Sequence, residues 1–195
     1  MMSPRTKLAL IMTLFALPTL ASFAAFYWLP PTKTNNYGEL ISPTINLPQV
    51  SVNVIDGSDA AQGIGDQGLR GKWLIVTRDS GACASACEQK LFAMRQTRLI
   101  VGREMDRVVR VVLIDDDAKP PEELIRRYQG TAWISAKALP WLAKLPIPQG
   151  EASNGRAFFF AVDPLGNIFM RYGADADTKL IAKDLRQVLK ASQIG

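Results

Sequence analysis

Asp79-Ser80-Gly81-Ala82-Cys83-Ala84-Ser85-Ala86-Cys87-Glu88 contains the only two cysteines of the 195-residue chain, which has no histidine. The segment follows Trp73–Thr77, a short apolar run that is typical of a strand buried on both faces. Two thiols separated by three residues just after a strand suit thiol and disulfide chemistry or the capture of a soft metal ion. The absence of imidazole excludes histidine-dependent catalysis and removes the commonest metal ligand.

The residues after the cysteines predict a βαβ unit. A helical pattern runs from about Ala84 to Val101, and residues 108–114 read as a second buried strand. A strand, helix and strand of this size are expected to form a parallel, right-handed unit. Residues 124–128 then predict a short helix, whereas the prolines that follow leave the stretch up to residue 156 without an assigned element.

The C-terminal part predicts a β-hairpin and a final helix. Residues 157–162 and 168–172 are apolar runs on either side of Asp163-Pro164-Leu165-Gly166-Asn167, which is turn chemistry. Asp177 or Thr178 can cap the last helix, whose apolar residues recur at helical spacing and are expected to cover the sheet.

An uncharged run, Leu8 to Leu29, follows Arg5 and Lys7 near the N-terminus. As a helix it would measure about 33 Å, close to the hydrocarbon thickness of a bilayer. Because basic residues favour the cytoplasmic side, we expect residues 1–7 in the cytoplasm, residues 8–29 as a single transmembrane anchor in the inner membrane, and the rest in the periplasm. A cleaved signal peptide is the alternative, but its apolar region would be only about 7 to 15 residues long.

The stretch from Pro30 to about Val50 is rich in Pro, Asn and Thr and shows no helical periodicity. This composition is typical of a tether. We therefore expect a linker at residues 30–50 and one folded domain at residues 51–195.

The charge balance gives no sign of a nucleic-acid partner. Three of the 23 Lys and Arg precede Tyr37, and no acidic residue does, so the rest of the chain is nearly neutral. A local basic stretch is interleaved with apolar residues and is expected to be a solvated helix face, with a docking patch for an acidic partner as the alternative. Its members are Lys90, Arg95, Arg98, Arg103, Arg107 and Arg110.

The order of elements, and three short segments, resemble the Sco/SenC branch of thioredoxin-like proteins. The segments are Gly71-Lys72-Trp73, residues 79–87 and Val162-Asp163-Pro164-Leu165-Gly166-Asn167, together with the N-terminal apolar run. More closely, the chain resembles small bacterial membrane proteins, distant from true Sco proteins, that are associated with cytochrome c oxidase assembly. The resemblance covers roughly residues 37–195. It implies a thioredoxin-like, three-layer α/β/α domain and a thiol-containing partner, such as an oxidase subunit or a copper chaperone.

One departure from the family concerns copper. Sco proteins bind copper with two cysteines and a histidine just before the hairpin, whereas here that region reads Glu151-Ala152-Ser153-Asn154-Gly155-Arg156. The family's third ligand cannot be carried over. Met94 would lie about 10 Å beyond Cys87 along a helix, too far to share one ion.

Cys83 and Cys87 are the candidate catalytic residues. Residues four apart on a helix have Cα atoms about 6 Å apart, within the range that a disulfide tolerates. Cys83 is expected to be the attacking thiol, because a helix N-terminus, with added charge from Arg78, lowers the pKa of a thiol. Cys87 is expected to be the resolving thiol. Asp79 and Asp115 each end a predicted strand, where a turn or cap role is commoner than proton transfer.

Three functions fit these residues. The favoured one is a periplasmic thiol-disulfide oxidoreductase that needs no cofactor and acts in assembly of the copper site of cytochrome c oxidase. The second is a Cu(I) chaperone whose metal ligands are Cys83 and Cys87, since two thiolates can hold a soft monovalent ion. The third is a non-catalytic docking module with a structural disulfide, although a bridge over about five residues would stabilise the fold by only roughly 2 kcal/mol.

Overall fold

The computed structural model describes residues 3–28, 35–56, 64, 68–148 and 155–195. The chain divides into two compact units, Met1–Asn35 and Asn36–Gly195. The expected anchor residue Leu29, most of the Pro30–Asn35 stretch and residues 151–154 lie outside the described residues.

The described residues of the first unit form one helix, α1, which runs from Pro4 to Trp28 and contains no charged residue after Lys7. It is apolar on all sides, so it lacks the polar face that would turn toward water in a surface helix. Among the described helices, α1 alone is long and apolar enough to cross a bilayer. Residues 8–28 of the expected span therefore lie within one continuous helix.

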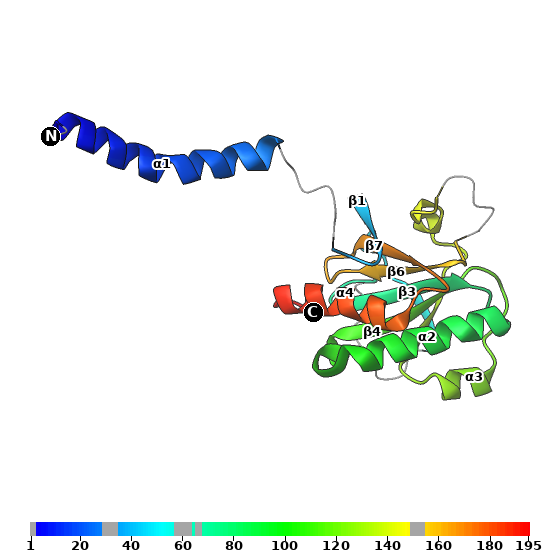
Figure 1. Cartoon of the computed structure of the whole chain (residues 1–195). Helices are drawn as coiled ribbons and strands as arrows, with labels where there is room; N and C mark the ends of the chain where they lie inside the picture. The colour runs from blue at the N-terminus through cyan, green and yellow to red at the C-terminus, as the bar shows by residue number, and fades with distance from the viewer. Residues whose placement is uncertain (1–2, 29–34, 57–63, 65–67, 149–154) are drawn as a thin grey trace. The chain divides into compact units, whose positions relative to one another are not determined.

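The second unit is built on one seven-stranded sheet with the strand order β1-β7-β6-β3-β4-β5-β2. Its elements, labelled where space allows in Figure 1, are β1 (Glu39–Asn46), β2 (Asn53–Asp56), β3 (Trp73–Asp79), α2 (Ser85–Val101), the 3-10 helix η2 (Gly102–Arg107), β4 (Val108–Ile114), α3 (Glu122–Arg127), β5 (Thr131–Ser135), the 3-10 helix η3 (Pro140–Lys144), β6 (Phe158–Val162), β7 (Asn167–Gly173) and α4 (Thr178–Ala191).

The sheet is mixed, and its centre is the predicted βαβ unit. β3 pairs in parallel with β4, from Trp73 opposite Val108 to Asp79 opposite Ile114. β6 and β7 form the predicted antiparallel hairpin, and β6 pairs antiparallel with β3. The capping prediction for α4 is also confirmed, because Asp177 accepts a hydrogen bond from the Lys179 amide at 2.7 Å. The α/β class inferred from the sequence is confirmed.

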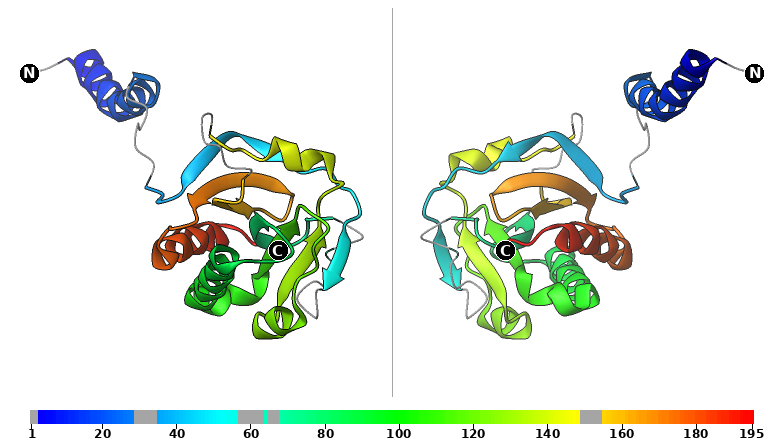
Figure 2. Two further views of the ribbon diagram at one scale, coloured as in Figure 1. Left: turned by 90° about the vertical axis from the view of Figure 1, so that its right-hand side faces the viewer. Right: turned by 90° about the vertical axis from the view of Figure 1, so that its left-hand side faces the viewer.

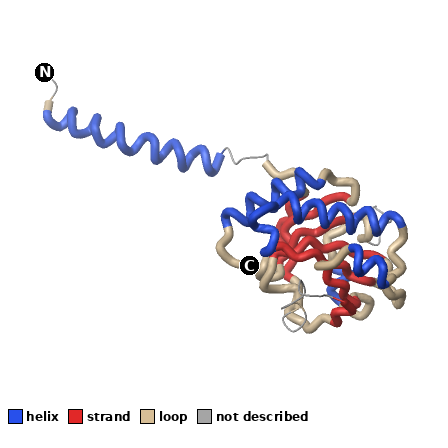
Figure 3. Tube along the Cα trace, turned by 90° about the horizontal axis from the view of Figure 1, so that it is seen from below, coloured by secondary structure: helices blue, strands red, loops and turns tan. Residues whose placement is uncertain are grey.

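The layers differ on the two faces of the sheet. One face carries α2, α3 and α4, and its side chains pack in two clusters around Phe159 and Trp133. The opposite face is covered by η3 and by non-helical segments, with Phe160 and Trp141 in its core. Figure 2 shows α2 and α4 side by side on one side of the sheet and η3, in yellow, on the other. Figure 3 shows helices, in blue, lying over the strands of the sheet, in red. The expected third layer is therefore a short 3-10 helix with irregular chain.

The domain begins earlier than the sequence predicts. β1 lies within the expected linker and pairs antiparallel with β7 at the sheet edge. The buried carboxylate of Asp184 on α4 accepts hydrogen bonds from the amides of Tyr37 and Gly38, the latter at 2.8 Å. The linker prediction is thus wrong over residues 39–46. This segment shows no periodic sequence pattern, but it is held in the domain by backbone pairing with β7 and by the carboxylate of Asp184.

Candidate disulfide site

Cys83 and Cys87 are joined by a disulfide at the beginning of α2. Their Cα atoms are 5.0 Å apart. Cys87 lies in the first turn of the helix, whereas Cys83 lies two residues before it with a φ of 43°, a left-handed conformation that is uncommon for a residue other than glycine. The prediction that both cysteines lie on a helix is therefore wrong for Cys83, because the helix begins only at Ser85.

The two cysteines are exposed to different extents. Cys87 is 2% exposed, and Cys83 is 9% exposed. They pack against Leu91 of α2, Leu124 of α3 and, from the sheet, residues that include Val112. The bridge thus lies in an apolar cluster under the α2 and α3 layer, with Cys83 nearer to solvent.

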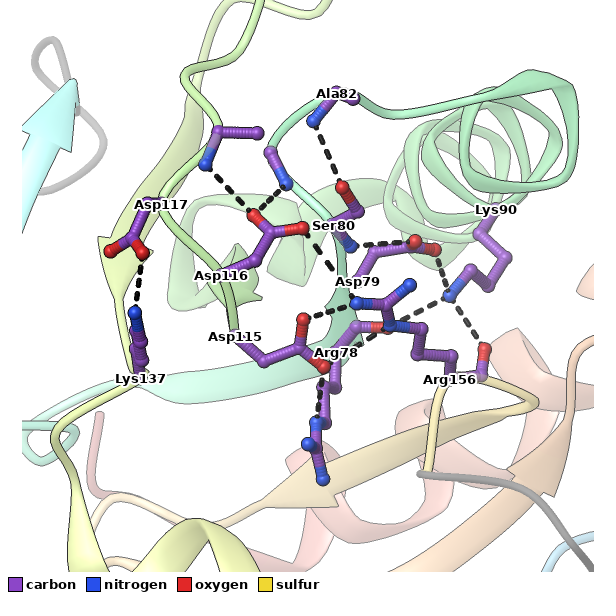
Figure 4. A network of polar contacts seen from close by, with 12 residues as sticks. Arg78, Asp79, Ser80, Ala82, Lys90, Asp115, Asp116, Asp117, Lys137 and Arg156 are labelled. Carbon is purple, nitrogen blue, oxygen red and sulfur yellow. Dashed lines mark hydrogen bonds and ion pairs between the residues drawn. The ribbon is translucent and has the colours of Figure 1, made fainter.

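A tight loop leads from β3 to Cys83. The Gly81 amide donates to Asp116 at 3.0 Å, and the Ala118 amide donates to the same oxygen at 3.1 Å. A Cβ on Gly81 would lie 1.8 Å from the carbonyl oxygen of Ala118, so no other residue fits without moving the backbone. Hydrogen bonds from the Ser80 hydroxyl and the Gly81 amide hold the pKa of Asp116 below its usual value. Figure 4 shows Asp116 close to Ser80 and Asp79 at the end of β3.

Below this loop, Asp79 and Lys90 form a buried ion pair with a distance of 2.6 Å between Oδ2 and Nζ. Lys90 also donates to the backbone carbonyls of Arg78 at 3.0 Å and Arg156 at 2.6 Å. Burial lowers the pKa of the Lys90 ammonium, although Asp79 opposes that effect. One side chain on α2 therefore ties the cysteine helix to β3 and to the segment before β6.

A second ion cluster surrounds Asp115, at the end of β4. Its carboxylate accepts from Arg78 Nε at 2.6 Å and from Arg156 Nη2 at 2.5 Å. Burial is the largest single effect on the pKa of Asp115 and would raise it. The hydrogen bonds and charges of Arg156 and Arg78 together outweigh burial, so the pKa lies below its usual value. Arg78, which is expected to add positive charge near Cys83, is thus paired with Asp115.

Two of the six residues of the predicted basic helix face are buried, so the prediction that they are solvated is wrong. Lys90 is 4% exposed in its pair with Asp79, and Arg110 is 5% exposed in the middle of β4. Arg95 and Arg103 are exposed, as expected of a solvated face. The sequence pattern failed here because an isolated cation in an apolar stretch can be buried when a tertiary partner or backbone acceptor is available.

The described residues do not provide a complete copper site of the kind that the family uses. No group of three or more His, Cys, Asp and Glu side chains within the described ranges is placed to hold a metal ion. Met94 is buried with Phe159 and Leu185 in the cluster beneath α4, and the cysteines belong to a different cluster. The donor set available for copper is therefore the thiolate pair that reduction of the bridge would produce.

Comparison with known families identifies the fold. The sequence model of the family described as transmembrane-like, thioredoxin-like, C-terminal domain matches residues 73–192. The chain belongs to this family. The match begins at the first residue of β3 and extends one residue beyond α4, so it includes both cysteines and strands β3 to β7.

Solved structures of Sco proteins share the fold of this family member. Yeast Sco1 aligns with a TM-score of 0.57 and 13% identity over 78% of this chain and 98% of Sco1. A SCO1/SenC family lipoprotein from Bacillus anthracis aligns with a TM-score of 0.53 and 17% identity over 77% and 98% of the two chains. Copper-bound ScoI from Bradyrhizobium japonicum aligns with a TM-score of 0.50 and 16% identity over 73% and 98%. The predicted resemblance is confirmed at the level of the fold. A comparison with curated proteins finds no match.

Proposed function

We propose that this protein is a membrane-anchored periplasmic thiol-disulfide oxidoreductase that acts through Cys83 and Cys87. The observation that carries the proposal is the bridge between these residues at the head of α2, on a thioredoxin-like sheet. A bridge across so short a loop constrains the unfolded chain weakly, so stability alone is a poor reason for its position. Reversible opening is the better explanation.

Cys83 is the exchanging thiol in this proposal, and Cys87 resolves the intermediate. Cys83 is the more exposed of the two and lies just before the N-terminus of α2, where free amides and the helix dipole favour a thiolate. The Cys83 thiolate attacks a partner disulfide, forms a mixed disulfide and releases one partner thiolate. Cys87, after losing its proton, attacks the Cys83 sulfur, closes the bridge and releases the second. Two electrons pass to the partner, and the reverse sequence oxidises a partner dithiol.

The setting in the cell is inferred from the N-terminus and from the family. Arg5 and Lys7 precede α1, which favours a cytoplasmic N-terminus and a periplasmic domain. The periplasm is a compartment in which disulfides form and persist. The Sco-like fold supports a thiol-containing partner in the assembly of the cytochrome c oxidase copper site, either an oxidase subunit or a copper chaperone.

Equilibration of the full chain in detergent against a series of glutathione redox buffers tests the exchange. We expect a reduction potential above about −300 mV, the range of labile and catalytic disulfides. Cys87→Ser should accumulate a mixed disulfide through Cys83, whereas Cys83→Ser should not. A lower potential, or function retained by a Cys83→Ser, Cys87→Ser chain in cells, would identify an inert bridge in a docking module.

Copper carriage is the second candidate, supported by the copper-bound relatives with the same fold and by the two sulfurs. In this case Cu(I) is a cargo, and the reduced thiolates of Cys83 and Cys87 would bind it. A competition between the reduced chain and a Cu(I) chelator distinguishes this candidate. One equivalent of Cu(I) bound by the native chain, and none by the double serine variant, would establish a carrier.

A further inference from the structure

Arg110 is a buried cation with an incomplete set of partners. It lies in the middle of β4 and is 5% exposed. Its Nη2 donates to the Gln129 carbonyl at 2.5 Å, but Nε and Nη1 have no hydrogen-bond partner in the described part of the chain. Thr131 lies opposite Arg110 in the register of β4 and β5, and its buried hydroxyl likewise has no partner among the described residues.

Positive charges near Arg110 make its burial still less favourable. Burial, followed by the charges of Arg98 and Arg95, lowers its pKa to about 10. Arg98 has its own partner, since it pairs with Asp106 at 3.1 Å. Within the described ranges Arg95 forms no ion pair. A buried arginine with neighbouring cations and no carboxylate is costly for the fold, so an anion supplied from outside would complete the cluster.

The stripe of α2 that carries Arg95 also presents exposed apolar side chains. Phe92 is 56% exposed and Leu99 is 51% exposed, and they lie three residues before and four residues after Arg95. A groove beside Phe92 is lined by Tyr128 of α3 and by Ser85, Glu88 and Gln89 of α2. Glu88 would repel an anion, but it is already paired with Arg127 at 2.5 Å.

We propose that Arg95 and Arg110 are the anion-binding part of a docking surface for an acidic segment of a partner protein, with Phe92 and Leu99 as its apolar contacts. The side chain of an Asp or Glu beside an apolar residue matches this combination. Arg110 donates to the carbonyl of Gln129, the residue after Tyr128, so its guanidinium lies next to a residue that lines the groove.

This surface lies on the helix that carries Cys87. Arg95 is eight residues farther along α2, which corresponds to about 12 Å. The proposal rests on the proposed function in one respect, because the docked protein would be the one that exchanges thiols with Cys83. Charge on this face would accelerate and orient its encounter with the disulfide.

Binding of a labelled acidic peptide to the full chain in zwitterionic detergent tests the proposal. The probe is a short peptide that alternates Glu with Leu and Phe, and its control replaces each Glu by Gln. We expect the acidic peptide to bind at least tenfold more tightly than its control and to weaken with added salt. Arg110→Met and Arg95→Gln should each reduce its affinity at least tenfold. Arg186→Gln, which removes an exposed cation from α4, should leave it unchanged.

The stability of Arg110→Met separates docking from a structural role. Methionine has a similar length and no charge. If Arg110 serves binding and does not stabilise the fold, the urea midpoint of Arg110→Met should equal or exceed that of the native chain. A lower midpoint would show that Arg110 stabilises the fold and would overturn the proposal. No binding of the acidic peptide at millimolar concentration, or equal binding of both peptides, would overturn it as well.

A membrane is the competing occupant of this surface. Hydrogen exchange of the full chain in nanodiscs, with zwitterionic or anionic lipid, tests it: protection of α2 that requires anionic lipid and Arg110 would overturn the partner assignment. The peptide measurement is repeated on the Cys83→Ser, Cys87→Ser chain. Peptide binding that survives in this chain, together with an inert bridge in the glutathione titration, would refute thiol exchange while leaving the docking surface intact.

Discussion

Lys90 Nζ lies 2.6 Å from Asp79 Oδ2, and this buried pair joins the helix that carries Cys87 to the strand that leads to Cys83. The two cysteines therefore depend on one ion pair for their relative position as well as on their own bond. The same ammonium reaches the carbonyl of Arg156, just before β6. Reduction of the disulfide would thus leave the loop and the helix connected.

Replacement of Lys90 by methionine should destabilise the domain severely. Asp79 would remain buried without its cation, and the carbonyls of Arg78 and Arg156 would lose a donor, at a cost of roughly 3–5 kcal/mol. Urea unfolding measures the loss. Lys137→Met, which removes an exposed pair with Asp117, is the control and should cost less than about 1 kcal/mol. Equal losses in the two variants would show that the buried pair has no special role.

Gly81→Ala should disturb the loop before Cys83. The added Cβ would meet the Ala118 carbonyl, so the backbone must move, at a cost of about 3 kcal/mol. Gly102→Ala is the control: its φ of 79° disfavours alanine, but nothing lies near the added atom, and we expect about 1–2 kcal/mol. The rate at which dithiothreitol reduces the bridge should change in the first variant alone. An unchanged rate there would contradict a role of this loop in positioning Cys83.

Alkylation of the reduced chain should modify Cys83 before Cys87. Cys83 is the more exposed residue and lies at the helix N-terminus, whereas Cys87 is buried under α3. With limiting iodoacetamide, peptide mass spectrometry should find the label predominantly on Cys83. Preferential labelling of Cys87 would reverse the proposed roles of the two thiols.

Asp115 should make the stability of the domain depend on acid pH. Its pKa is lowered in the folded state, so its stabilising contribution is complete above the unfolded value of about 3.9 and is lost as pH falls through the folded value. Asp115→Asn should cost roughly 3–5 kcal/mol near neutral pH, because Arg78 and Arg156 lose their shared carboxylate. The difference from the native chain should narrow below about pH 4. A difference that stays constant down to the acid transition would contradict the assignment.

Asp184→Ala should release β1 from the domain. The amides of Tyr37 and Gly38 lose a buried acceptor, which should cost about 3 kcal/mol. Limited proteolysis of the full chain should then cut within residues 36–46 much faster. Asp177→Ala, which removes only the cap of the same helix, should cost about 1 kcal/mol and leave cleavage in that segment unchanged. Rapid cleavage in the native chain would instead support the linker that the sequence predicts there.

The central elements could be predicted because their signals are local. β3 and β4 are continuous apolar runs, the hairpin is marked by Asp163 and Gly166, and α4 carries a helical period behind the Asp177 cap. Strands buried on both faces and tight turns depend on the residues within them, so the sequence alone is enough to locate them. The cysteine spacing likewise indicated that a bridge could form.

The outer strands and the ion pairs could not be predicted in this way. β1 is held by the edge of β7 and by Asp184, which lies more than a hundred residues away in sequence. The sequence analysis did not assign β5. Its apolar run is short and is soon followed by Pro140, and such a run fits a short strand as well as a helix that a proline ends.

The sequence by itself determined the redox-spaced cysteines, the parallel βαβ core and the apolar N-terminal helix, since each is encoded by neighbouring residues. Only the tertiary structure decided which cations are buried and which acids they meet. Lys90 and Arg110 look alike in the sequence, yet Lys90 pairs with Asp79, whereas two nitrogens of Arg110 have no partner among the residues that the structure describes. The physical reason is that the cost of burying a charge depends on the groups that the fold places around it, and these come from distant parts of the chain.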